Sequence, residues 1–173
     1  VRELLKYSTI EHITLVDLDP RMTELGQRNP LFRRINRNSL QNPRVSLLNQ
    51  DAFKFVEQDT NVYDVIIIDL PDPHDTGLSK LYTVEFYRFI YKRLAPGGVM
   101  TTQATSAYFA PDAFWCIVHT VREVFGSRTL PYFTHVPTFG GVWGFVAGVA
   151  PRQPVDPETV SISLPTDTLG GAA

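Results

Sequence analysis

Two carboxylates three residues apart, Asp69 and Asp72, are the side chains best placed to carry chemistry. They follow residues 65–68, four β-branched residues in a row, which predict a central strand buried on both faces, as in a parallel sheet. Ligands of open α/β sheets bind outside the carboxyl ends of the strands. We therefore predict a site for a cationic substrate at this turn. A proline-rich turn in which Asp72 bonds locally is the alternative.

Acidic residues also follow two earlier predicted strands. Asp17 and Asp19 follow residues 13–16, and Asp51 follows residues 45–48. An acidic residue at such a position in a nucleotide-binding fold often bonds ribose hydroxyls, and we predict that role for Asp17. Asp19 suits a helix cap, because Pro20 would be the first helical residue. Asp51 fits a helix cap and a contact with an adenine amino group equally well.

Strand patterns alternate with helical ones along the chain, which predicts an α/β fold with a mostly parallel sheet. The last two strands, 129–135 and 142–149, are joined too tightly for a crossover, so one of them should run antiparallel. We predict an opening helix over 1–7, and residues 29–42 are expected to be a polar connection. The predicted α/β domain covers residues 1–150, and residues 151–173, which contain four prolines, form a tail.

The composition narrows the classes of function. A net charge of −2 over 173 residues argues against a nucleic-acid partner. The four histidines lack metal-ligand spacing, so we expect no metal site. A single cysteine, Cys116, precludes a disulfide within the chain; we expect it to be a core residue in a protein of a reducing, cytoplasmic compartment. No apolar stretch is long enough to span a bilayer.

The glycine-rich G-x-G-x-x-G loop of nucleotide-binding α/β folds occurs nowhere in the sequence. Such a loop follows the first strand, and here the chain opens at Val1 within a helical pattern. We therefore expect the chain to be part of a longer protein whose first strand and loop precede Val1. A sheet that lacks this strand has an uncovered edge, so we also expect a homo-oligomer.

Several segments, in order, resemble the polyamine aminopropyltransferases, the family of spermidine synthase. The resemblance covers roughly residues 1–150. Its most specific parts are the aspartate pair, the Glu-Phe-Tyr piece at 85–87 and the Trp-Gly-Phe piece at 143–145. The Leu-Ala-Pro-Gly-Gly piece at 94–98 is shared with many adenosylmethionine-dependent methyltransferases, so the resemblance implies their Rossmann-like sheet.

The resemblance implies roles for single positions. Asp69 matches the residue that deprotonates the amine. The positions implied to bind the nucleoside co-substrate are Asp17, Asp51, Ala52, Asp69 and Leu70. The positions implied to bind the amine are Asp72, Gln103, Phe139 and Trp143. Asp17 stands where a glutamate is more usual, and Phe139 where a tyrosine is usual. Leu70 and Pro71 replace two serines, a variant similar to the branch often fused to a membrane region, which implies a membrane-attached parent.

The implied reaction is the transfer of an aminopropyl group from decarboxylated S-adenosylmethionine, a co-substrate, to a diamine such as putrescine, which yields spermidine and methylthioadenosine. No prosthetic group is implied. The partner would be a small polyamine. Two alternatives stay open: a methyltransferase on the same fold, and a non-catalytic piece of such a domain.

Overall fold

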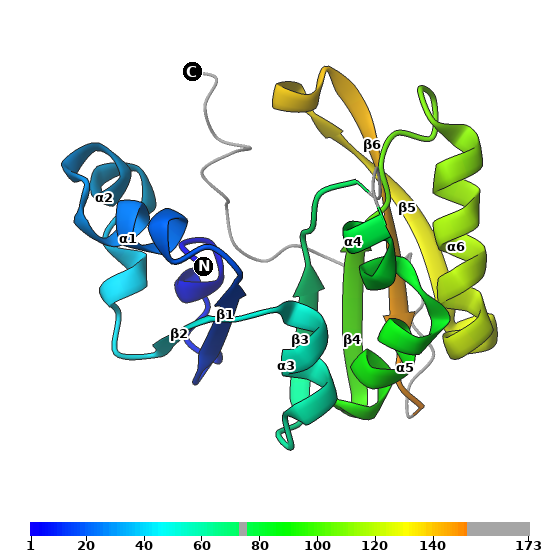
Figure 1. Ribbon diagram of the computed structural model, residues 1–173, viewed down its shortest axis with the longest axis horizontal. Helices are drawn as coiled ribbons and strands as arrows, with labels where there is room; N and C mark the ends of the chain where they lie inside the picture. The colour runs from blue at the N-terminus through cyan, green and yellow to red at the C-terminus, as the bar shows by residue number, and fades with distance from the viewer. Residues whose placement is uncertain (73–75, 152–173) are drawn as a thin grey trace. The chain divides into compact units, whose positions relative to one another are not determined.

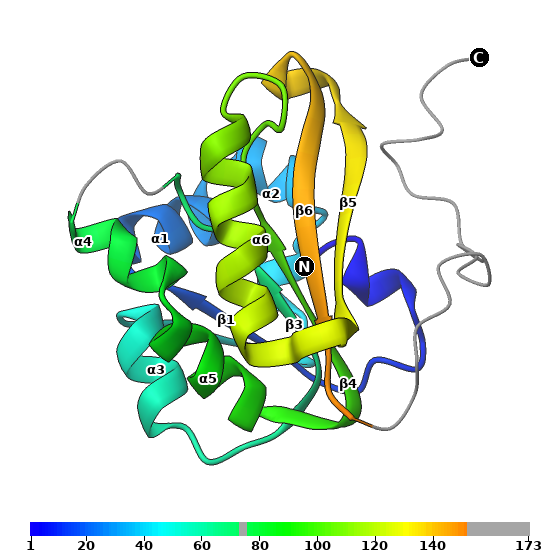
Figure 2. The ribbon, with the colours of Figure 1, turned by 90° about the vertical axis from the view of Figure 1, so that its right-hand side faces the viewer.

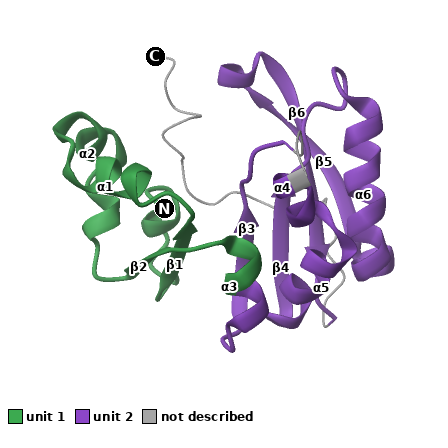
Figure 3. Ribbon diagram, viewed as in Figure 1, with its two compact units in different colours: residues 1–55, 157–173 green, residues 56–156 purple. Residues whose placement is uncertain are grey.

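The computed structural model describes residues 1–72 and 76–151 (Figure 1). These residues form two compact units, of which the first holds residues 1–55 and the second continues from residue 56 (Figure 3). The single domain expected over 1–150 remains a prediction. Of the expected tail 151–173, only Pro151 lies within the described residues.

Unit 1 is built around a parallel pair of strands, whose register runs from Ile13 opposite Val45 to Asp17 opposite Asn49. Both strands therefore end at the same edge of the pair. Its elements are η1 (Leu4–Lys6), β1 (Ile13–Asp17), α1 (Pro20–Arg28), α2 (Pro30–Asn36), η2 (Ser39–Gln41), β2 (Val45–Asn49) and the start of α3 (Ala52–Gln58).

Helix α2 corrects the expectation of a polar connection over 29–42. Asn29 caps this helix, since its side-chain oxygen accepts from the amides of Leu31 and Phe32, and Pro30 occupies the first helical position. The helix ends where Arg37 adopts a left-handed conformation with φ of 55°. An Asn-Pro pair starts a helix as readily as a turn, so the local sequence favoured the wrong alternative.

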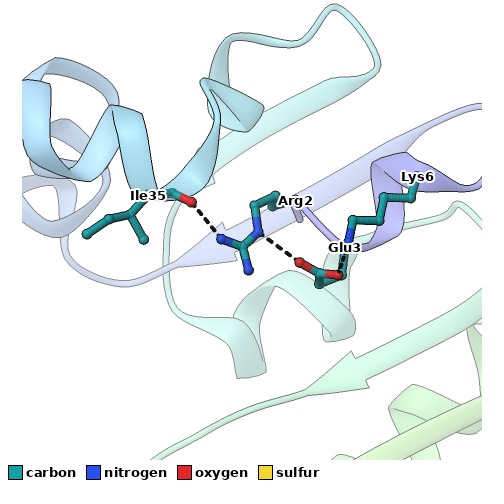
Figure 4. A network of polar contacts seen from close by, with 4 residues as sticks. All are labelled: Arg2, Glu3, Lys6 and Ile35. Atoms are coloured by element: carbon teal, nitrogen blue, oxygen red, sulfur yellow. Dashed lines mark hydrogen bonds and ion pairs between the residues drawn. The ribbon is translucent and has the colours of Figure 1, made fainter. Parts of the chain in front are cut away.

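The opening of the chain is a single 3-10 turn, η1, rather than the predicted helix over 1–7. It is tied down by charged side chains (Figure 4). Arg2 Nε lies 2.8 Å from Glu3 Oε1, and Arg2 Nη1 donates to the carbonyl of Ile35 at 2.7 Å. Lys6 Nζ pairs with the other oxygen of Glu3 at 2.8 Å. These contacts fix the turn against the end of α2.

Arg44 anchors the rest of the opening segment. Its guanidinium donates to the carbonyls of Leu5, Tyr7 and Ile10, at 3.0, 3.3 and 2.7 Å. Because a guanidinium has five N–H donors in a rigid fork, one side chain can satisfy several carbonyls of an irregular segment. Residues 5–10 are thereby held beside the start of β2.

Unit 2 holds a four-stranded sheet in the order β3-β4-β6-β5. Strands β3 and β4 are parallel, and β6 is antiparallel to both of its neighbours, so the predicted antiparallel closing strand is confirmed. Its elements are β3 (Tyr63–Ile68), α4 (Thr76–Ser79), η3 (Lys80–Tyr82), α5 (Val84–Lys92), β4 (Leu94–Gln103), α6 (Pro111–Phe125), η4 (Gly126–Arg128), β5 (Thr129–Val136), η5 (Pro137–Phe139) and β6 (Gly141–Val149).

One face of this sheet is covered by α5 and α6, which pack against each other (Figure 2). Met100, Thr102 and Val146 point to this face and are fully buried. Phe114 of α6 is also fully buried. It approaches Gly144 of β6 so closely that a Cβ there would lie 2.6 Å from its ring. The core of unit 2 therefore lies between the sheet and these two helices.

Strand β3 is an outer strand of this sheet and is not buried on both faces, in contrast to the sequence prediction. Ile68 is buried, but Val65 and Ile67, which point to the opposite face, are 58% and 53% exposed. A continuous apolar run shows that a strand can be buried, but it does not determine which element covers each face.

Two further expectations concern single features. Cys116 is exposed, and the expectation of a core cysteine was therefore wrong. Its helix, α6, buries Ile117 and Val118, and Cys116 lies on the outer side of this stripe. In the described part of the chain, no helix has the length and apolar character needed to cross a membrane.

Candidate active site

The turn that follows β3 carries the two predicted carboxylates. Asp69 lies directly after the strand and is exposed, and Asp72 is half-buried. The carboxyl ends of β3 and the parallel strand β4 meet at one edge of the sheet, and Gln103 is the last residue of β4. The topology thus places Gln103 beside the aspartate turn, although Gln103 follows Asp72 by 31 residues in the sequence.

The amide nitrogen of Gln103 contacts three acceptors that lie between residues 70 and 82. Nε2 lies 2.7 Å from the carbonyl of Leu70 and 3.0 Å from Oδ1 of Asp72. It also donates to the hydroxyl of Tyr82 at 2.8 Å. The carboxylate of Asp72 is therefore held by a side chain whose own position is fixed by the sheet.

The amide oxygen of Gln103 accepts from two donors, the backbone N–H of Thr105 at 2.9 Å and the indole Nε1 of Trp143 at 3.2 Å. Both groups are donors only, so they fix which end of the amide faces Asp72. The hydroxyl of Thr105 approaches Oδ2 of Asp72 at 3.4 Å. The structure thus brings Asp72, Gln103 and Trp143 together, as the resemblance implied.

Thr105 has a left-handed backbone with φ of 58°, which is unusual for a β-branched residue and indicates local strain. Its carbonyl accepts from Gly144 N at 2.8 Å, and Gly144 O accepts from Ala104 N at 2.9 Å. A Cβ at position 144 would lie 2.9 Å from the Thr105 oxygen, so only glycine allows this approach. The strained backbone points the Thr105 amide at Gln103.

Aromatic rings lie beside this polar cluster. The rings of Phe139 and Trp143 contact each other with centroids 4.8 Å apart. Phe139 is 55% exposed, whereas Trp143 is half-buried. The resemblance implied that both residues bind the amine, and the two rings in contact form an apolar surface without a hydroxyl.

Tyr82 belongs to the cluster and was missed in the sequence as a site residue. Its hydroxyl donates toward the carbonyls of Leu70 and Pro71, at 3.2 and 3.0 Å. Burial raises the pKa of Tyr82 to about 12. The negative charges of Asp72 and Asp69 act in the same direction, whereas the hydrogen bond from Gln103 acts in the opposite direction. The hydroxyl is therefore a donor near neutral pH. The Tyr82 hydroxyl bonds residues that are distant in sequence, so no pattern in its own segment indicated this role.

The remaining predicted residues lie in unit 1, at the carboxyl ends of β1 and β2. Asp19 caps α1 by accepting from Arg21 N at 2.8 Å, which confirms its predicted role. Asp17 Oδ1 accepts from Asp19 N at 2.8 Å. Asp51 Oδ1 accepts from Phe53 N at 2.8 Å, at the start of α3. This hydrogen bond supports the interpretation of Asp51 as a helix cap, and the contact of Asp51 with adenine stays a prediction.

The half-buried Ala52 is the first residue of α3, next to Asp51. Asp17 and Asp51 belong to unit 1, whereas Asp69, Leu70 and Asp72 belong to unit 2. Among the residues with a described position, no group of three or more acidic, histidine or cysteine side chains could hold a metal ion.

Comparison with known proteins identifies the family. The model of the spermine/spermidine synthase domain matches residues 1–155. The chain belongs to the spermine/spermidine synthase family. This family membership confirms the resemblance seen in the sequence.

Relatives and solved structures agree with this assignment. Polyamine aminopropyltransferase 2 of Ralstonia nicotianae is 42% identical over 169 residues, which are 98% of this chain and 32% of the relative. The chain thus spans about a third of the length of this curated relative. A crystal structure of spermidine synthase in complex with the transition state analogue AdoDATO is similar with a TM-score of 0.79. It is 27% identical, and the match covers 91% of this chain and 54% of that one.

A third similarity concerns the fold alone. The N-methyltransferase NodS of Bradyrhizobium japonicum, in complex with S-adenosyl-L-homocysteine, matches with a TM-score of 0.54 and 13% identity, over 82% of this chain and 67% of that one. The fold class predicted from the sequence, a Rossmann-like α/β fold of the methyltransferase type, is therefore confirmed.

Proposed function

We propose that this chain carries the amine site of an aminopropyl transfer from decarboxylated S-adenosylmethionine to a diamine such as putrescine, with spermidine and methylthioadenosine as products. The observation that carries the proposal is the bond between Gln103 and Asp72 beside the exposed Asp69. Both substrates are cations, and a site with two neighbouring carboxylates attracts cations. The family and the names of the relatives support the same reaction.

In this reaction the nitrogen lone pair of the diamine attacks the aminopropyl carbon that is bound to sulfur. The carbon–sulfur bond breaks, and its electrons leave with sulfur as a neutral thioether. An alkylammonium has a pKa of about 10.4, so the attacking amine must first lose a proton. Asp69, exposed at the end of β3, accepts this proton. Asp72 holds an ammonium group of the diamine as a fixed counter-charge.

The other predicted residues have supporting roles in the proposal. Gln103 lines the amine site next to Asp72, and Phe139 with Trp143 forms an apolar wall for the methylene chain. In unit 1, Asp17 binds the ribose, and Asp51 with Ala52 contacts the adenine of the co-substrate. In unit 2, Asp69 and Leu70 are the positions that the resemblance assigns to the co-substrate. The decarboxylated nucleoside is consumed in the reaction, and no prosthetic group takes part.

The proposal includes assembly and location. We propose that the chain associates with a second copy, since Val65 and Ile67 expose an apolar strip on the outer strand of the unit 2 sheet. The single cysteine favours a reducing compartment, and we propose a cytoplasmic location, with attachment of a longer parent to a membrane as the extension of that proposal.

The amine site is tested by titrating the protein with 1,4-diaminobutane and following the indole N–H resonance of Trp143 by NMR. We expect this resonance to shift. Asp72→Asn should weaken binding about 10- to 100-fold, because a bond to a charged group is worth about 1.5–3 kcal/mol. Asp64→Asn, which neutralises an exposed aspartate within β3, is the matched control and should bind normally. An unshifted resonance in the wild type, or normal binding by Asp72→Asn, would contradict the proposal.

The nucleoside is tested by thermal unfolding with methylthioadenosine and, in parallel, with adenosylhomocysteine. A ligand at 100 times its dissociation constant stabilises a protein by about 2.7 kcal/mol. For a chain of this size we expect a rise of about 5–11 °C with methylthioadenosine. A rise with adenosylhomocysteine alone would favour a methyltransferase, whose fold the chain shares. No rise with either would favour a non-catalytic piece.

A further inference from the structure

We propose that Tyr82 is a positioning residue for the amine site: its hydroxyl fixes the turn after β3 and the Gln103 amide, and so sets where the Asp72 carboxylate lies. This inference rests on the proposed function for its effect on amine binding, but its structural part can be tested without any ligand. Tyr82 ends η3, between the aspartate turn and α5, and its side chain is 8% exposed.

The hydroxyl of Tyr82 connects two segments that are distant in sequence. On one side it faces the carbonyls of Leu70 and Pro71, at 3.2 and 3.0 Å. On the other it accepts from Gln103 Nε2 at 2.8 Å, at the end of β4. A phenylalanine would fill the same space but would leave both sides without this connection.

The direction of these bonds follows from the donor count. The Gln103 amide oxygen faces two donors, so its NH₂ group must face the acceptors. Its two protons serve three acceptors: the Leu70 carbonyl, Asp72 Oδ1 and the Tyr82 hydroxyl. Because Tyr82 accepts from Gln103, its own proton goes to a carbonyl of the turn. Two hydrogen bonds of fixed direction, from Gln103 to Tyr82 and from Tyr82 to the turn, therefore connect β4 to the segment that carries Asp72. We call this pair of bonds the relay.

Tyr82 also determines how the Gln103 protons are shared. Without its hydroxyl, Nε2 retains the Leu70 carbonyl and Asp72 as acceptors, and the amide is free to rotate toward either. The Pro71 carbonyl loses the donor that holds the turn on that side. Asp72 then has more freedom, and a diamine must order it on binding, which lowers the affinity.

Tyr63 provides a matched control in the same unit. It is the first residue of β3, at the opposite end of the strand from the aspartate turn, and its hydroxyl donates to Asp59 Oδ2 at 2.6 Å. Tyr63→Phe therefore deletes a hydrogen-bonded hydroxyl away from the aspartate turn, whereas Tyr82→Phe deletes the relay. The two substitutions make the same chemical change.

The experiment compares Tyr82→Phe, Tyr63→Phe and wild type by NMR and by ligand titration. In ligand-free protein, Tyr82→Phe should shift the Gln103 side-chain amide and Trp143 indole resonances, and Tyr63→Phe should not. With 1,4-diaminobutane, Tyr82→Phe should raise the dissociation constant about three- to tenfold, the value of one hydrogen bond.

Unchanged Gln103 and Trp143 resonances in ligand-free Tyr82→Phe would overturn the inference, whether or not the diamine binds. If wild type binds no diamine, the proposed function fails while these resonances still decide the role of Tyr82. Equal diamine affinity in Tyr82→Phe and wild type would also overturn it. Should Tyr82→Phe fold poorly, the wild type gives a second measurement: the Tyr82 hydroxyl proton must be protected from exchange, and its absence from the spectrum would count against the relay.

Discussion

The bonds around Asp72 show how a small set of neutral side chains can fix one carboxylate. Both the nitrogen and the oxygen of the Gln103 amide are hydrogen-bonded. Thr105, whose backbone is strained, donates one of the bonds to the oxygen. Neutral donors hold an anion in place without cancelling its charge, so Asp72 keeps its attraction for a cation. The site therefore combines a fixed position with a negative charge.

At the residue scale, the raised pKa of Tyr82 predicts a loss of stability in alkali. Below pH 10 the phenol is neutral in both the folded and the unfolded state. Between pH 10.0 and about 12 the unfolded phenol ionises while the folded one stays neutral. Ionisation of Tyr82 in the unfolded state should lower the free energy of unfolding over this range by about 3 kcal/mol at most. Denaturant unfolding at pH 9 and 11.5 measures this fall.

Tyr82→Phe is the control for this pH dependence. The variant should lose less stability than wild type between the two pH values, because one late-titrating phenol is gone. Other groups ionise in both proteins and cancel in the comparison. An identical fall in the two proteins would show that the folded and unfolded pKa values of Tyr82 are equal.

At the scale of elements, the approach of β6 to α6 and to the Thr105 loop depends on Gly144. An alanine there would place its Cβ 2.6 Å from the Phe114 ring and 2.9 Å from the Thr105 carbonyl. We expect Gly144→Ala to destabilise the protein by about 1–3 kcal/mol, as overpacking does. It should also shift the Trp143 indole resonance, since residue 143 is its neighbour. Denaturant unfolding and NMR measure the two effects.

A double substitution identifies the obstacle. Phe114→Leu removes part of the ring, so Gly144→Ala combined with Phe114→Leu should cost less than the sum of the single changes. Strictly additive costs would assign the clash to the Thr105 carbonyl instead.

The elements also show what the sequence could predict. The strand ending at Ile68 followed from a local pattern, and the structure confirms it. The roles of the carboxylates after it stay predictions. The bond between Gln103 and Asp72 joins residues 31 apart, and no local pattern contains it. Tyr82 was missed for the same reason: its role lies in bonds to Leu70, Pro71 and Gln103, not in its own segment. The family resemblance supplied Gln103, which the periodicity did not.

Two misses have different causes. Helix α2 was missed because Asn29 and Pro30 suit a turn as well as a helix start. The exposure of Val65 and Ile67 was missed because a hydrophobic run favours burial of a strand but does not identify the element that would cover each face. Periodicity thus identifies the strand, while the coverage of its two faces depends on the tertiary arrangement.

At the scale of the whole molecule, the exposed strip on β3 predicts association. We expect the sedimentation coefficient to rise with concentration, since an exposed apolar strand favours pairing with another copy. Ile67→Lys should abolish this rise by placing a charge in the strip. Leu31→Lys, which changes another exposed apolar residue, on α2, is the control and should leave it intact. A wild-type protein that stays monomeric at all concentrations would contradict the prediction.

The three hydrogen bonds from Arg44 to carbonyls of residues 5–10 affect how fast the first segment of the chain unfolds locally. Three carbonyls depend on one guanidinium, so they cannot be released one at a time while its position is kept. The chain opening and the start of β2 therefore behave as one cooperative unit in amide hydrogen exchange, rather than as a fraying end beside a protected strand. In this chain, the first residues should open on the timescale of the strand that holds them.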